Sequence, residues 1–265
     1  MKVARYGWKP DVPDWRDRKF TRRLGLALVP SEVDKSGVLP PPYDQQSVGS
    51  CTGNATAGAV QYDEIVQQNT STMLSRLFIY FGARKLDGME WVDGGAYLRN
   101  CIKWINSIGV CSEVAWPYDT NAVNTPPPQY CYDNATEKAM LYERLDNTDI
   151  DALRGCLAQG LPFVFGFTAY DSFEGEAIRQ TGVLCLPGPD ESVVGGHAVL
   201  AVGYRDETKQ FIVRNSWGPN WGGPMKGHFL MPYSYISNPD LADDFWAIQR
   251  VANVQPSNNP PLPAP

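Results

Sequence analysis

Apolar and polar residues recur at helical spacing in the first half of the chain. From Cys51 onward, apolar positions separated by four, three and four residues predict one face of a helix: Ala55, Ala59, Tyr62 and Val66. The polar residues between them are expected to face away from the core: Asn54, Gln61, Asp63, Glu64 and Gln67. Similar patterns predict further helices over 74–85, 95–108 and 150–158.

The second half has the pattern of short strands. Runs rich in β-branched and aromatic residues, separated by Gly, Pro and Asp, lie at 162–168, 197–204, 210–215, 227–232 and 245–251. A proline-rich connection at 121–128 precedes them. We therefore expect an α+β chain with a helical lobe over about 45–125 and a strand lobe, a barrel or sandwich, over about 126–254. The proline-rich end, 255–265, is expected to be a disordered tail.

Length and composition favour a globular protein with two lobes. The chain has 265 residues, of which 43% are hydrophobic, and this is enough for a substantial core. Its longest apolar runs, 161–167 and 198–204, fall far short of the ~18 residues that a membrane-spanning helix needs. The start of the chain has no apolar signal-peptide segment. The sequence predicts a soluble monomer that is cytoplasmic or exported by a leader outside this chain.

Charge divides the chain into a basic start and an acidic remainder. The net charge is −6, but residues 1–28 hold eight basic and three acidic residues, whereas the rest hold 15 and 26. Residues 1–28 show no sustained period, so we interpret them as an irregular arm, extending to about residue 38 at most. The body, 29–254, carries the opposite charge, so arm and body are expected to attract each other.

Cysteine and histidine are the candidate reactive groups. The six cysteines form no Cys-x-x-Cys pair and none lies near a histidine at metal-ligand spacing, so no metal site is expected. Cys51 stands at a predicted helix start, where the helix dipole lowers the pKa of a thiol. A nucleophilic thiol also needs a base, and only His197 and His228 are available. His197 follows two glycines at the start of an apolar strand, whereas His228 lies within an ordinary strand and is interpreted as a structural or surface residue.

An amide and an indole follow His197 in the chain. Asn215 can orient an imidazole, and Trp217 can shield that contact from water. With these residues the chain resembles the papain family of cysteine peptidases, in the bacterial branch that includes xylellain. The motifs that carry the resemblance occur in the family's order: Gln45-x5-Cys51, Asp93-Gly94-Gly95, Gly196-His197-Ala198-Val199 and Asn215-Ser216-Trp217-Gly218. The resemblance implies a helical lobe with the cysteine, a β-barrel lobe with the histidine and asparagine, and an active-site cleft between them.

The resemblance also implies a role for each of these residues. Cys51 would be the nucleophile, as a thiolate paired with the His197 imidazolium, and Asn215 would orient the imidazole. The Gln45 side chain and the Cys51 backbone N–H would form the oxyanion hole. The expected substrate contacts are Gly94, Gly95, Gly196 and Trp217. Peptide or protein substrates and no organic cofactor are implied, and the chemistry is an endopeptidase reaction through an acyl-enzyme thioester.

Alternatives remain open for the activity and for the arm. The same Cys-His-Asn set serves an exopeptidase or an acyl transferase, and a silent relative would only bind peptides. The arm is too short for an independent inhibitory domain but long enough to cross the cleft as a short blocking propeptide. Alternatively, its basic cluster would hold a phosphate-bearing ligand or another anion: Arg16, Arg18, Lys19, Arg22 and Arg23. The disulfides typical of relatives are not expected, because the partner cysteines are absent.

Overall fold

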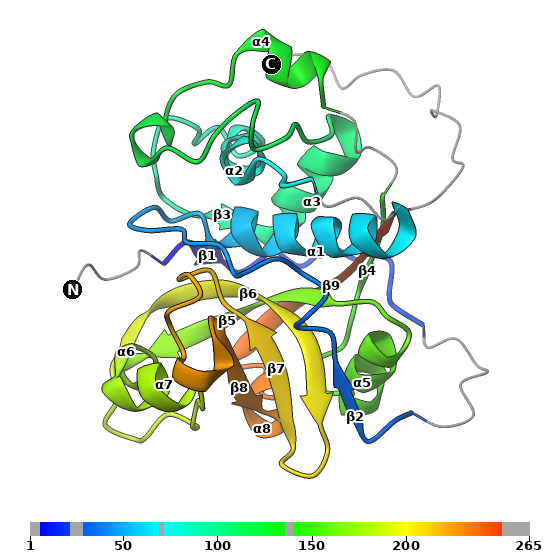
Figure 1. Ribbon diagram of the computed structural model, residues 1–265, viewed down its shortest axis with the longest axis vertical. Helices are drawn as coiled ribbons and strands as arrows, with labels where there is room; N and C mark the ends of the chain where they lie inside the picture. Colours follow the sequence, from blue (N-terminus) through cyan, green and yellow to red (C-terminus); the bar gives the residue numbers. More distant parts are fainter. Residues whose placement is uncertain (1–5, 22–28, 69–71, 136–139, 251–265) are drawn as a thin grey trace.

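The computed structural model describes residues 6–21, 29–68, 72–135 and 140–250. One long helix, α1 (Cys51–Gln68), separates a helical half from a sheet. Figure 1 shows α2 (Arg76–Lys85) and α3 (Leu98–Ser107) on one side of α1 and the strands on the other. The short helix α4 (Gln129–Asp133) belongs to the helical half, so the chain completes this half before it builds most of the sheet.

The sheet has seven strands in the order β4-β9-β5-β6-β7-β8, with β2 paired to β6. All of these pairings are antiparallel. The bounds are β2 (Glu32–Asp34), β4 (Met140–Arg144), β5 (Phe163–Tyr170), β6 (Val193–Arg205), β7 (Gln210–Arg214), β8 (His228–Pro232) and β9 (Ala242–Arg250). Among the described residues no pairing joins the end strands β4 and β8. The antiparallel sheet beside a helical half is the α+β arrangement that the sequence predicts.

Four short helices accompany the sheet: α5 (Ile150–Ala158), α6 (Asp171–Glu174), α7 (Glu176–Thr181) and α8 (Tyr233–Ile236). Helix α5 begins and ends where the sequence predicts, and two flanking residues explain why. The Asp149 side chain accepts from the backbone N–H of Ala152 at 2.9 Å and caps its start. Gly160, with φ of 79°, provides the left-handed turn after its end.

The helix predicted from Cys51 is present, but its solvent face was predicted wrongly. Asn54, Gln61 and Glu64 are buried, whereas Val66, placed on the apolar face, is 58% exposed. The reason is that α1 packs on α2 and α3 on one side and on β6 and β9 on the other, so it has little free face. The buried polar groups have partners instead, as when the Asn54 amide donates to the Ser50 carbonyl at 2.8 Å.

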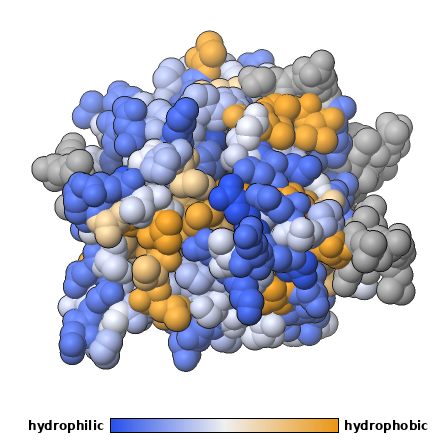
Figure 2. Space-filling model, turned by 60° about the horizontal axis from the view of Figure 1, so that its bottom comes forward, coloured by the Kyte–Doolittle hydropathy of each residue, from blue (hydrophilic) through white to orange (hydrophobic). Residues whose placement is uncertain are grey.

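Each helix and each strand predicted from the pattern overlaps one observed element. The pattern missed β2, β4, two further two-residue strands at Trp8–Lys9 and Ala96–Tyr97, and the short helices α4, α6, α7 and α8, because elements of two to six residues show little of a period. The predicted tail, 255–265, lies outside the described residues. Over the described part of the chain, no helix has the length and apolarity to cross a membrane. Figure 2 shows one face of the molecule, on which apolar patches are interspersed with hydrophilic residues.

Candidate active site

Cys51 is the first residue of α1 and is fully buried. The loop before it is held by the helical half, because the backbone N–H of Gly49 donates to Asp93 Oδ1 at 3.1 Å. The same carboxylate oxygen accepts from the hydroxyl of Tyr80, on α2, at 2.6 Å. The first backbone N–H groups of a helix have no partner within the helix, so a thiolate at Cys51 lies where negative charge is stabilised.

His197 lies on β6 with its ring fixed by Asn215. The distance between His197 Nε2 and Asn215 Oδ1 is 2.8 Å. The backbone N–H of Ser216 donates to the same Oδ1 at 2.8 Å, which identifies this amide atom as the oxygen. Nε2 therefore carries a hydrogen. His197 Nδ1 is buried without a hydrogen-bond partner among the described residues, so it is the ring nitrogen left to accept a proton from a thiol.

Cys51 begins α1 and His197 lies on β6, and these two elements pack on each other. Burial raises the pKa of the Cys51 thiol to about 11, while backbone hydrogen bonds from Ala198, the residue after His197, and Gly7 lower it. Burial also lowers the pKa of His197 to about 4, and the bond to Asn215 acts in the opposite direction. The buried site thus favours a neutral thiol and imidazole over the predicted ion pair, because it is shielded from water.

Gln45 is fully buried and tied to the loop that carries Asn215. Its backbone N–H donates to the Ser216 carbonyl at 2.8 Å, and the Ser216 hydroxyl donates to its side-chain Oε1 at 2.5 Å. The Nε2 group donates to the Val48 carbonyl at 2.9 Å. These contacts hold the amide in one orientation, with its carbonyl end facing the sheet side.

The arm covers this site. Its strand β1 (Trp8–Lys9) pairs in parallel with β3 (Ala96–Tyr97). Just before β1, the backbone of Gly7 bridges the two halves: its N–H donates to the Gly196 carbonyl at 3.1 Å, and its carbonyl accepts from Ala96 N–H at 2.8 Å. A Cβ built on Gly7 would lie 1.8 Å from the Gly49 carbonyl oxygen. Only a residue without a side chain fits at this crossing.

Side chains of the arm complete the cover. The Tyr6 ring lies 5.7 Å from the His197 ring and 6.0 Å from the Trp217 ring, measured between centroids. Further along, Asp17 pairs with Arg99 of α3 at 2.5 Å. This pair joins an acid of the arm to an arginine of the body, which is the reverse of the predicted pairing of a basic arm with an acidic body. Among the arm cations, Arg18 pairs with Glu143 of β4 at 2.8 Å.

Residues 29–243 match the family described as papain family cysteine protease. The chain belongs to this family. The protein is therefore a cysteine peptidase, and its fold is the papain-like one. Xylellain, a cysteine protease from Xylella fastidiosa, is 41% identical, with a TM-score of 0.85 over 95% of this chain and 99% of that structure.

Other relatives of the protease come from different sources. An uncharacterized peptidase C1-like protein of Acanthamoeba polyphaga mimivirus is 42% identical over 94% of this chain and 88% of the viral protein. Cathepsin K of Gallus gallus is 28% identical over 87% of this chain and 65% of its own length. A Carica candamarcensis cysteine protease, solved with the inhibitor E-64, shares the fold at a TM-score of 0.62 and 18% identity. The similarity thus extends beyond the bacterial branch.

The predicted substrate contacts divide into two groups. Gly95, Gly196 and Trp217 lie against the arm. Gly95 has a φ of 85°, and a Cβ built on it would clash with the Gly7 carbonyl oxygen at 2.4 Å. At Gly94, among the described residues, a Cβ would meet only Val92, at 3.8 Å.

Sequence reasoning missed the support around the protease's histidine and glycine pair. The Tyr80 hydroxyl accepts from the backbone N–H of Gly95 at 2.9 Å while it donates to Asp93, so one tyrosine connects the glycine turn to the loop before Cys51. Phe167 and Phe173 each lie 5.7 Å from the His197 ring. No local pattern marks these residues, since each comes from a different element.

The second histidine and the cysteines other than Cys51 lie outside this arrangement. His228 is buried with Nδ1 3.2 Å from the Met225 carbonyl, and burial lowers its pKa to about 4, which fits the structural role predicted for it. All six cysteines, which fall within the described residues, are free thiols, and Cys185 is the exposed one.

Replacing Asn215 with alanine is expected to lower kcat/KM about 10²-fold, because the imidazole loses its orientation. The hydrogen bond to Asn215 raises the pKa of His197, so the alkaline limb of the pH profile should move to lower pH. The matched control is Asn147→Ala. Asn147 is also buried and donates to the Ile236 and Ala242 carbonyls, but lies away from His197. Equal pH profiles for the two variants would contradict an orienting role.

Proposed function

We propose that the protease is an endopeptidase with Cys51 as nucleophile and His197 as general acid and base. The observation that carries this proposal is the fixed imidazole: Nε2 is bonded to Asn215, and Nδ1 is left for the thiol at the start of α1. Transfer of the thiol proton to Nδ1 produces a thiolate and an imidazolium once the cover is removed and water can solvate both charges.

In the first half of the reaction, the Cys51 thiolate attacks the peptide carbonyl carbon and the carbonyl oxygen becomes an oxyanion. The backbone N–H of Cys51 and the Gln45 amide stabilise that charge, a contact worth about 10²–10³ in rate. His197 then gives its proton to the leaving amine as the C–N bond breaks, leaving a thioester. In the second half, His197 takes a proton from water, hydroxide attacks the thioester, and the thiol is restored as the acid leaves.

The path of the arm favours an endopeptidase over an exopeptidase. The described part of the arm lies on both sides of Gly7, with Tyr6 against the His197 ring before it and Trp8 in β1 after it. Downstream it stays in extended contact with the body, as in β1 and in the bond from the Phe20 N–H to the Arg144 carbonyl at 2.8 Å. A cleft that accepts a through-running chain suits cleavage within a polypeptide.

The arm is a short propeptide, and the protease is made as a zymogen. Gly7 occupies the backbone position next to Cys51, and Tyr6 covers His197. The alternative role of the arm, binding a phosphate-bearing ligand or another anion, has less support. Arg16 pairs with Asp14 at 2.7 Å and Arg18 with Glu143, so two of the five cations have acidic partners, while Arg22 and Arg23 lie outside the described residues.

The experiment is hydrolysis of internally quenched peptides by the full-length chain, with the products identified by mass spectrometry. An endopeptidase gives two internal fragments with a new amine and a new acid. Release of terminal residues alone would indicate an exopeptidase, and transfer of the acyl group to an added amine, without acid, would indicate a transferase. Absence of products after the arm is displaced would leave only a peptide-binding role.

Arm binding should weaken as pH rises from 4 to 7. Burial, followed by the charge of Asp11, raises the pKa of Asp244 to about 7 beneath the docked arm, against about 3.9 for a free aspartate. Between these two pKa values, Asp244 therefore holds a proton in the docked state that it lacks in the undocked state. Docking is favoured at low pH, and the affinity of the arm for the body falls by up to about tenfold per pH unit until pH 7. Burial raises the pKa of Asp11 too. Arg144 and Asp243 also face Asp244, the first favouring ionisation and the second opposing it.

The measurement is the activity of the full-length chain divided by that of a Gly7→Ala chain at each pH, which removes the pH profile common to both. This ratio should rise towards neutral pH and then level off. With Asp244→Asn in both chains, the rise should become smaller. A ratio that falls between pH 5 and pH 7 would contradict the expectation.

A further inference from the structure

The segment from Gln45 to Cys51 carries both groups that the proposed reaction uses for the oxyanion, the Gln45 amide at one end and the Cys51 backbone N–H at the other. The hydroxyl of Tyr118 spans this segment. It donates to the Gln45 carbonyl at 2.8 Å, and it lies 2.5 Å from Ser50 Oγ. One side chain from the connection after α3 thus contacts the first residue of the segment and the residue just before the nucleophile.

The direction of each hydrogen bond around Tyr118 can be assigned. A tyrosine hydroxyl has one hydrogen, and Tyr118 uses it for the Gln45 carbonyl, so the Ser50 hydroxyl donates to Tyr118. Ser50 Oγ in turn accepts from Asn54 Nδ2, on α1, at 3.0 Å. Gln45, Ser50 and Asn54 are all buried. Each step from α1 to Gln45 therefore joins a donor to an acceptor away from water, which favours a single geometry.

The backbone of this segment needs support from outside. Gln46 has a φ of 53°, in the left-handed region that a residue with a side chain keeps only when its surroundings hold it there. Its N–H donates to Asp44 Oδ1 at 2.8 Å, in an exposed turn. The Tyr118 hydroxyl holds the carbonyl on one side of Gln46 and the Ser50 side chain on the other. It therefore fixes the shape of the segment from the buried side.

Tyr118 is itself held by an ion pair. The guanidinium of Arg76, on α2, lies 4.1 Å from the centre of the Tyr118 ring, and Arg76 pairs with Glu113 at 2.6 Å. Glu113 Oε1 also accepts from the Tyr118 backbone N–H at 3.0 Å. The two side chains of the pair are 9% and 12% exposed, so salt screens their attraction only weakly. Both the ring and the backbone of Tyr118 are thus fixed to one unit.

We infer that Tyr118 is a positioning residue for the oxyanion hole of the protease. Its hydroxyl sets the distance between the Gln45 amide and the Cys51 N–H, while Arg76 holds its ring. Donors aimed at an oxyanion act on a charge that develops only as the tetrahedral intermediate forms, so their placement affects the transition state more than the bound substrate. Tyr118 therefore acts on kcat rather than on KM. This inference rests on the proposed function, which assigns the oxyanion hole to Gln45 and Cys51.

A purely structural role, joining this segment to the helical half, would also explain the contacts of Tyr118. That role predicts a loss of stability and an equal effect on every reaction of Cys51. The positions of the two contacts favour the catalytic account, because each lies within one residue of an oxyanion donor. The two accounts differ in which reactions of the thiol are affected.

The test is Tyr118→Phe in the full-length Gly7→Ala chain, a change that keeps the ring and removes the hydroxyl. We expect kcat for a quenched peptide to fall about 10-fold, with KM within about twofold of the parent value. The rate at which iodoacetamide alkylates Cys51 should stay within about twofold. In that reaction the thiolate displaces iodide and forms an S–C bond, so no oxyanion develops.

A second measurement adds Gln45→Ala. The Gln45 amide is then absent, so loss of the Tyr118 hydroxyl has one donor fewer to misplace. In this background Tyr118→Phe should lower kcat by at most about threefold, because two residues that act through one group do not have additive effects. A structural role would give the same factor in both backgrounds.

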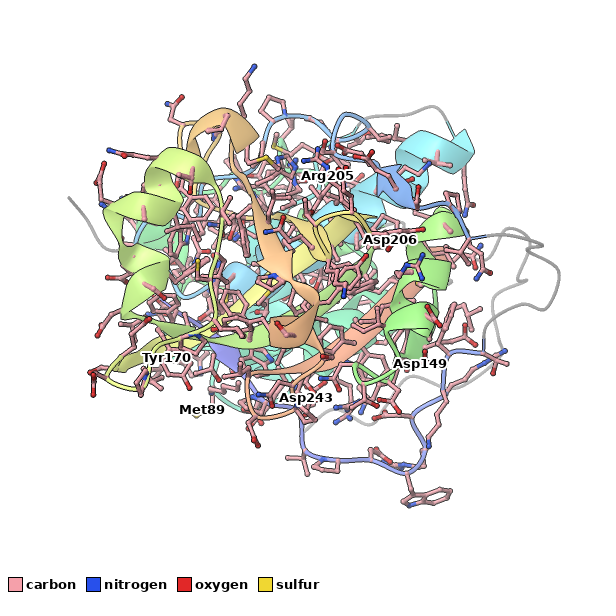
Figure 3. All side chains as sticks on the ribbon, turned by 90° about the horizontal axis from the view of Figure 1, so that it is seen from below. Met89, Asp149, Tyr170, Arg205, Asp206 and Asp243 are labelled. Atoms are coloured by element: carbon pink, nitrogen blue, oxygen red, sulfur yellow. The ribbon has the colours of Figure 1, made fainter. Side chains whose placement is uncertain are left out.

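The matched control is Tyr204→Phe. Tyr204 is also buried, and its hydroxyl also donates to a backbone carbonyl, that of Pro30, at 2.6 Å. It lies on β6 seven residues after His197, and Figure 3 shows Asp206, two residues further on, beside α5. Because it loses the same kind of hydrogen bond away from the reacting groups, this variant should keep kcat within about twofold.

Three results would overturn the inference: an unchanged kcat in the Tyr118→Phe chain, an equal fall in hydrolysis and in alkylation, or a 10-fold fall that persists beside Gln45→Ala. Two other results would overturn the proposed function and the inference with it. They are a Gly7→Ala chain that hydrolyses no peptide, and a hydrolysis rate that Gln45→Ala leaves unchanged.

Discussion

Replacing Cys51 with alanine should lower peptide hydrolysis by about 10⁴–10⁶-fold in a chain whose arm has been displaced, the size of effect seen when a covalent nucleophile is removed. The physical reason is that no other thiol takes its place. Cys51 alone stands at the start of α1, which packs on the strand of His197. The other buried thiols lie elsewhere: Cys101, Cys131 and Cys156 within helices and Cys111 in the loop after α3. The measurement is kcat/KM on a quenched peptide.

The control for this variant is Cys185→Ser. Cys185 is the exposed thiol, so its removal tests whether a more accessible cysteine is responsible for the activity. Its rate should stay within about twofold of the parent chain, because a surface substitution rarely disturbs a distant site. Activity that persists in the Cys51→Ala chain and disappears in the Cys185→Ser chain would contradict the assignment.

Replacing Gly7 with alanine in the full-length chain should raise peptidase activity about 10- to 100-fold. The added Cβ would lie 1.8 Å from the carbonyl oxygen of Gly49, a residue whose backbone N–H donates to Asp93. Neither the arm backbone nor the Gly49 backbone can move easily, so the arm must lift from the site. Overpacking of this kind destabilises the docked state by about 1–3 kcal/mol. The measurement is the initial rate at low enzyme concentration, before any trimming of the arm.

Gly37→Ala is the matched control for this effect. A Cβ at Gly37 meets nothing within 4 Å, so the same chemical change outside the cleft should leave the rate of the full-length chain unchanged. If Gly7→Ala and Gly37→Ala behave alike, or if Gly7→Ala lowers the activity, the arm does not block the site.

The long elements and the reactive residues could be predicted from the sequence because their signals are local. The period from Cys51 predicts α1, and Asp149 and Gly160 bound α5 through caps that act within a few residues. The reactive set was found through short motifs around Cys51 and His197. The packing of α1 on β6 places the elements that carry them side by side, and the family resemblance implied that the two residues act together.

What the sequence did not reveal depends on contacts between distant segments. The arm has no period, so its path was open until Gly7 was seen between the two halves of the molecule. Asp244 comes next to an acidic neighbour and reads as a surface residue, but β9 pairs with β5 through an irregular register that places it beneath Trp8. The polar face of α1 was misread because a helix between two halves has no solvent side.

Covalent labelling of the full-length Gly7→Ala chain by E-64, with the modified residue mapped by mass spectrometry, tests the central claim most directly. A catalytic thiolate beside an imidazolium reacts with the epoxide, whereas buried or merely exposed thiols do not react at a comparable rate. We predict one molecule of inhibitor per chain, bound to Cys51, together with loss of activity and slower labelling of the chain that retains Gly7. A chain that stays unmodified at Cys51, or is modified first at Cys185, would contradict the account.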